Sequence, residues 1–131
     1  MDQMPLLNEL IEAGVRFLEE FNTNYPVAVA FWLKSADENR WHLHIASDKI
    51  KDGKTQDAYL EVLRITGQMK AMYFDPFYVT LRLMDDPIVR FALDFQHRYP
   101  KHMATVFNVP TFEGVEVEGM YLYPPLKTVA A

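Results

Sequence analysis

The sequence contains no cysteine, which excludes disulfide bonds, thiolate nucleophiles and cysteine-ligated zinc sites. A chain without cysteine suits a reducing compartment, so the expected location is the cytoplasm. No basic segment precedes an apolar core at the start, Met1-Asp2-Gln3, so no signal peptide is expected. No apolar run approaches the roughly 20 residues of a membrane-spanning helix, so no membrane association is expected.

The sequence also lacks any run of lysine and arginine. Its 131 residues include 13 basic and 18 acidic side chains, which give a formal net charge of −5. Because an acidic chain repels phosphate backbones, nucleic acid is not an expected partner. Hydrophobic residues make up 50% of the chain and aromatic residues 14%, which excludes a disordered protein. We therefore expect residues 1–131 to form a single globular domain.

The spacing of hydrophobic residues predicts an α+β fold in the order αββαβαββ. Helices are expected at 5–22, 55–72 and 87–99, and strands at 27–33, 41–46, 77–84, 103–109 and 115–123. Asp86 followed by Pro87 is a helix start, because the carboxylate accepts unpaired amides and the proline ring fixes a helical φ. The second helix is expected to bury a stripe composed of Tyr59, Val62, Leu63, Thr66 and Met69.

The order of elements predicts one mixed five-stranded sheet. The second and third helices each connect two strands, and right-handed crossovers would place both helices on the same face. The first helix can cover that face or the other. The helices would then lie mainly on one face, and the opposite face would stay open.

Two histidines stand one residue apart in the strand "RWHLHI" (40–45). Residues i and i+2 of a strand share a face about 7 Å apart, which allows His42 and His44 to bind one metal ion. Further ligands would have to come from distant positions. The available ones are His97, His102, Asp37, Glu38 and Asp48. The simpler interpretation, which we favour, is an ordinary strand that turns its apolar residues to the core, so no metal and no cofactor are expected.

Two other segments resemble functional motifs only superficially. "DKIKDGKT" (48–55) ends like a phosphate-binding loop, but Asp48 stands where the loop needs its first glycine. A nucleotide-binding function is therefore rejected. Asp85 and Asp86 could form a carboxylate pair, although the helix cap explains Asp86 better.

The open sheet face is the expected functional surface. If the second and third strands turn their even-numbered positions the same way, this face carries His42, His44, Tyr78 and Arg82. A face of this composition suits a small-molecule pocket or contact with another copy of the chain. We expect a non-enzymatic binding or assembly module that forms a homodimer. The alternative is a small hydrolase-type or metal-dependent enzyme that uses His42 and His44.

Overall fold

The structure is a computed structural model. It describes residues 7–35, 40–69, 74, 76–98, 105–107, 111–112, 115–124 and 126. The helices are α1 (Leu7–Asn24), α2 (Thr55–Met69) and α3 (Pro87–Arg98), with a 3-10 turn η1 (Pro76–Tyr78). The strands are β1 (Val29–Ser35), β2 (Arg40–Ala46), β3 (Val79–Arg82), β4 (Thr105–Phe107), β5 (Thr111–Phe112) and β6 (Val115–Leu122).

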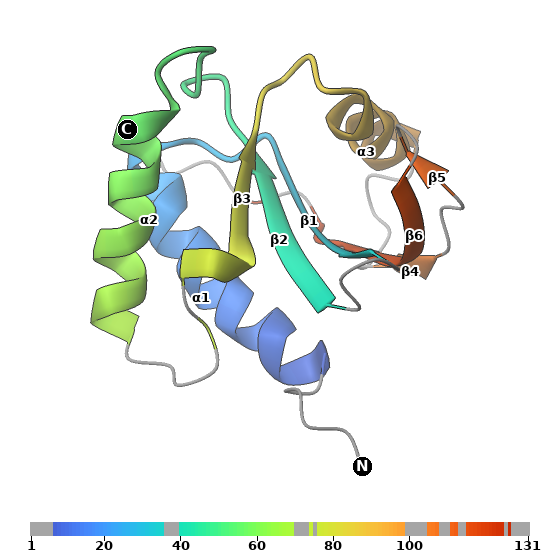
Figure 1. The fold of residues 1–131 in the computed structure, drawn as a ribbon, viewed down its shortest axis with the longest axis horizontal. Helices are drawn as coiled ribbons and strands as arrows, with labels where there is room; N and C mark the ends of the chain where they lie inside the picture. The colour runs from blue at the N-terminus through green and yellow to red at the C-terminus, as the bar shows by residue number, and fades with distance from the viewer. Residues whose placement is uncertain are drawn as a thin grey trace.

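The α+β class is confirmed, and the strands form a mixed sheet in the order β3-β2-β1-β6-β4 (Figure 1). The hairpin of β1 and β2 is antiparallel, and β3 joins β2 in parallel after the α2 crossover, both as predicted. The short strand β5 was not predicted, and it pairs with β6 beside the main path. Within the described residues the sheet therefore has six strands and not five.

The prediction that α2 and α3 share a face of the sheet is wrong. The helices α1 and α2 pack on one face, whereas α3 packs on the other (Figure 1). The crossover rule does not apply to α3, because β3 and β4 lie at opposite edges of the sheet and run in opposite directions. The connection through α3 spans the sheet and covers the face that was expected to be open.

The central strand β1 separates two layers of the core. Its Trp32 packs under α1 and α2, and its Phe31 packs under α3. Because residues 29–33 of β1 are buried on both faces, this part of the strand is a continuous apolar run without polar alternation.

A buried tyrosine fixes α1 to the sheet. The hydroxyl of Tyr123 accepts a hydrogen bond of 2.8 Å from Trp32 Nε1 and donates one of 2.7 Å to the carbonyl of Ile11. Burial raises the pKa of Tyr123, so the hydroxyl keeps its proton. Gly14 permits this approach, since a Cβ there would overlap the Tyr123 hydroxyl.

Several predictions about boundaries and ligands fall outside the described residues. These are the helix start at Pro5, the helix end at Pro100, the outer parts of the strand at 103–109, residues 70–72 of the second helix, and the ligand candidates Asp37, Glu38 and His102.

Candidate functional site

The histidine pair of β2 lies on the face that α3 covers. Leu43 and Ile45 point to the α1 and α2 layer, as predicted, so His44 points the other way. The His44 ring stacks on Phe31 at 5.3 Å with an interplanar angle of 7°. His44 is only 6% exposed, so it belongs to the interior and not to an open surface.

Arg82 of β3 holds the buried imidazole. Its Nε donates a hydrogen bond of 3.1 Å to His44 Nδ1, and its Nη1 donates one of 2.9 Å to Asp86 Oδ2. The other oxygen of Asp86 accepts the backbone N–H of Ile88 at 3.0 Å. This confirms Asp86 as the N-cap of α3. One chain of hydrogen bonds therefore joins β2, β3 and the start of α3.

The surroundings of His44 keep its ring neutral. Burial lowers the pKa of His44 to about 3, and electrostatic interactions with Arg82 and His42 act in the same direction. Since Nδ1 accepts the bond from Arg82, the proton of the neutral ring must sit on Nε2. A buried ring whose basic nitrogen is already occupied is poorly placed to bind a metal or to take a proton from a substrate.

The other predicted members of the face do not all meet there. His42 lies two residues before His44 on β2, is half-buried and pairs with Leu33 of β1. Tyr78 lies on the opposite side of the sheet, stacked on Phe74 at 6.0 Å, so the prediction that it shares a face with the histidines is wrong. Tyr78 belongs to η1 and precedes β3, so the two-residue period of the strand does not extend to it.

The described residues do not gather a set of metal ligands. Among them, no group of three or more histidine, aspartate or glutamate side chains lies close enough to hold an ion. Likewise, none of the helices in the described part of the chain is long and apolar enough to cross a membrane.

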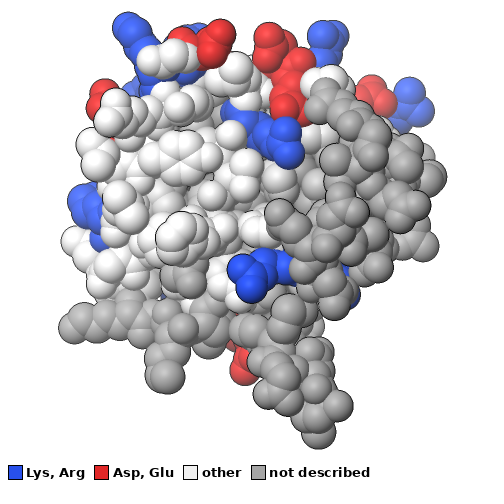
Figure 2. Space-filling model, viewed as in Figure 1, with Lys and Arg blue, Asp and Glu red and all other residues white. Residues whose placement is uncertain are grey.

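An exposed apolar patch lies at the other side of the molecule, on α2 and η1. It consists of Tyr59, Leu60, Leu63 and Phe77. Leu60 is 58% exposed, Leu63 is 53% exposed and Phe77 is 84% exposed. The elements α2 and η1 contact each other, and Figure 2 shows a largely uncharged surface over this region, with charged side chains gathered along the upper edge.

The prediction for the buried stripe of α2 is wrong at two positions. Tyr59 and Leu63 are exposed, and the helix buries Ala58 and Ile65 together with the predicted Val62 and Thr66. The sequence contained a signal for the patch, because α2 carries more apolar residues than one face can bury.

Tyr59 also protects the edge of the sheet. Its hydroxyl accepts a hydrogen bond of 3.0 Å from the backbone N–H of Leu81 in β3. Since β3 is the terminal strand of the sheet order, this amide would otherwise be available to a strand from another chain. The apolar patch therefore continues to a sheet edge that is closed at this position.

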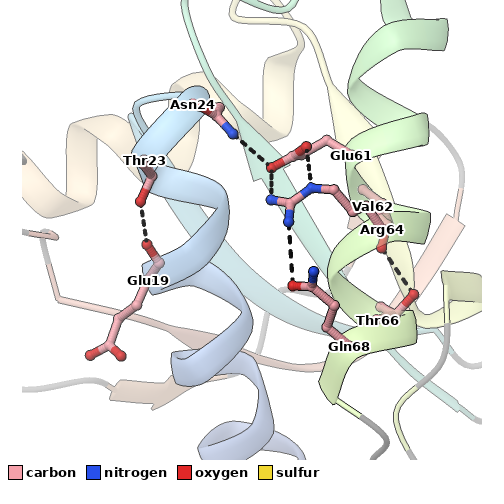
Figure 3. A network of polar contacts seen from close by, with 8 residues as sticks. All are labelled: Glu19, Thr23, Asn24, Glu61, Val62, Arg64, Thr66 and Gln68. Carbon is pink, nitrogen blue, oxygen red and sulfur yellow. Dashed lines mark hydrogen bonds and ion pairs between the residues drawn. The ribbon is translucent and has the colours of Figure 1, made fainter.

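The polar side of α2 is directed to α1 (Figure 3). Glu61 accepts a hydrogen bond of 2.9 Å from Asn24 Nδ2 and forms an ion pair of 2.6 Å with Arg64. The hydrogen bond from Arg64 lowers the pKa of Glu61. Arg64 also donates to Gln68 at 3.3 Å. Of these contacts, the bond from Asn24 joins α2 to α1, and the others lie within α2. The burial of Ala58, Val62, Ile65 and Thr66 leaves Leu60 and Leu63 directed outward.

Comparisons with protein-family models, with curated proteins and with solved structures find no match for this chain.

Proposed function

We propose that this domain is a small assembly module that acts by self-association and not by catalysis. The observation that carries the proposal is the exposed apolar patch on α2 and η1, with two leucines more than half exposed. Soluble monomers seldom leave clustered apolar side chains in water, and such patches mark interaction sites. A symmetric dimer is the commonest way to cover one.

The patch replaces the sheet face as the proposed contact surface. The face with His42, His44 and Arg82 lies under α3, so a second chain does not have access to it without displacing that helix. The cytoplasm remains part of the proposal and is supported by the cysteine-free sequence.

The contacts of His44 give less support to the alternative function, an enzyme. A small hydrolase-type or metal-dependent enzyme built on His42 and His44 would need an accessible imidazole with a free nitrogen. His44 is buried against Phe31 and accepts its hydrogen bond from Arg82. These contacts favour a structural role for the histidine over a catalytic one.

The test compares the size of the native protein with that of charged variants. Light scattering after size exclusion should give a mass above 15.3 kDa for the native chain, rising with concentration. The Leu60→Glu/Leu63→Glu double variant should stay at the monomer mass while remaining folded by circular dichroism. The matched control is Val15→Glu/Thr23→Glu, which adds two carboxylates to exposed positions of α1 and should behave as the native protein. A native chain that is monomeric at every concentration would overturn the proposal.

A further inference from the structure

The outward face of α2 carries a seam of four residues with the spacing of a helix contact. Gln56, Leu60, Leu63 and Gly67 follow one another at intervals of four, three and four residues, which places them on one side of the helix. All four are exposed, and none is charged. The opposite side of α2 is buried against the rest of the domain. A helix from another chain could therefore approach the seam from the solvent side.

We infer that the partner on this seam is the α2 helix of a second copy, antiparallel to the first and related to it by a two-fold axis. This inference rests on the proposed self-association and specifies its geometry. In the register that we propose, Leu60 packs against Leu63 of the second copy, and Gln56 packs against Gly67 of the second copy. The two-fold axis repeats both contacts.

Gly67 suits this register because it forms a gap in the seam. Among the described residues, no atom beyond its chain neighbours and the local helix backbone lies within 4 Å of the position that a Cβ would occupy there. The longer Gln56 side chain of the second copy can therefore lie against bare helix backbone. The centre of the contact then consists of two layers in which Leu60 packs against Leu63. At each end, a long Gln56 packs against a small Gly67, which gives the alternation of size that close helix packing requires.

The charges beside the seam favour the antiparallel direction. Asp57 and Arg64 lie on the same flank of α2 and are both exposed. In the proposed register Asp57 is offset from Arg64 of the second copy by two residues, or about 3 Å along the helix axis. The two-fold axis forms this ion pair twice. In a parallel pair the two-fold axis would place this flank of the two copies on opposite sides of the contact, so the ion pair between Asp57 and Arg64 would not form.

Arg64 can join such a pair without leaving its own domain. A guanidinium group has five N–H donors, and Arg64 directs three to Glu61 and Gln68. A contact confined to about three turns of α2 is smaller than the roughly 800 Å² per partner of a standard interface, so the dimer is reversible.

The absence of cysteine makes the register directly testable by disulfide formation. Single variants Gln56→Cys and Gly67→Cys are oxidised separately and as an equimolar mixture, and cross-linked dimer is measured on non-reducing gels. The mixture should give the disulfide, because the register brings position 56 of one chain against position 67 of the other. Each variant alone should give none, since its two cysteines would lie about 16 Å apart along the helices and a disulfide requires Cα atoms within about 7 Å.

Each other pattern has a defined meaning. Asp94→Cys on α3 is the collision control and should remain uncross-linked in every mixture, because its side chain is exposed and far in sequence from α2. Cross-linking of either seam variant alone would contradict the antiparallel register. A native protein that dimerises and loses its dimer in Leu60→Glu/Leu63→Glu, yet gives no disulfide in the mixture, would overturn the register and leave the proposed function standing. A monomeric native protein would overturn both.

Discussion

The Nε of Arg82 donates a hydrogen bond of 3.1 Å to the Nδ1 of His44. Because Arg82 is positively charged, a proton on the neighbouring His44 is unfavourable. The folded protein therefore holds the imidazole in its neutral form. The sequence alone predicts that these two residues belong to an open binding surface. Their contact instead connects two strands to the N-cap of α3 through Asp86.

The first prediction is a loss of stability in acid. Burial lowers the pKa of His44 to about 3, whereas in the unfolded chain it has the ordinary value of 6.5. Below pH 6.5 the unfolded chain therefore binds a proton that the folded chain does not, and unfolding becomes easier as the pH falls from 6.5 towards 3. The slope from this group is at most about 1.4 kcal/mol per pH unit.

Denaturant melts between pH 7 and pH 4 measure this slope. His44→Asn keeps an acceptor for Arg82 but cannot titrate, so its free energy of unfolding should fall less steeply than that of the native protein. His97→Asn, at an exposed position of α3, is the matched control and should keep the native slope. Equal slopes for the native protein and His44→Asn would show that the buried imidazole is not the titrating group.

The second prediction concerns the cap of α3. Asp86→Ala removes the acceptor for the N–H of Ile88 and the partner of Arg82, so the free energy of unfolding should fall by about 1–2 kcal/mol. Asp85→Ala, at the exposed neighbouring position, should change it by less than about 0.5 kcal/mol. Urea unfolding of both variants tests the assignment, which fails if Asp85→Ala is the more damaging of the two.

The third prediction compares two glycines within helices. Gly14→Ala places a methyl group on the Tyr123 hydroxyl and should destabilise the fold by about 1–3 kcal/mol. Gly67→Ala meets open space and should stabilise the fold by about 0.5–1 kcal/mol, because alanine favours a helix. Thermal melts of dilute protein should move in opposite directions, and a shift in the same direction for both would contradict the close approach at Gly14.

The fourth prediction is that metal removal has no effect. Since no group of three ligating side chains gathers among the described residues, treatment with a chelator should leave the melting temperature unchanged. Metal analysis of the purified protein accompanies this melt. Stoichiometric zinc, iron or manganese together with a lower melting temperature would favour the metal-dependent alternative.

Features encoded by neighbouring residues could be predicted from the sequence. The cap at Asp86 and Pro87 depends on the local backbone, and the structure confirms it. The alternation of His44 with Leu43 and Ile45 follows from the pleat of a strand, and it is confirmed as well. The parallel pairing of β2 and β3 follows from the α2 crossover between them.

Features that depend on distant pairing could not be predicted. The position of α3 depends on β6, which lies between β1 and β4 in the sheet. Because β4 is thereby at the edge opposite β3, the connection from β3 to β4 through α3 has to cross the sheet. Nothing in the residues near α3 encodes the position of β6. The rotation of α2 depends on its packing against α1 and the sheet, where it buries Ala58, Val62, Ile65 and Thr66. The periodicity of α2 alone therefore did not select which leucines face outward.

The most direct measurement is hydroxyl-radical footprinting of the native protein at low and high concentration. This method reports the solvent exposure of each side chain through its oxidation rate. If two copies meet through α2, the oxidation rates of Leu60 and Leu63 should fall as the concentration rises, whereas the rate of Val15, exposed on α1, should not change. Rates for the two leucines that do not depend on concentration, while the protein dimerises, would place the contact elsewhere and contradict the account.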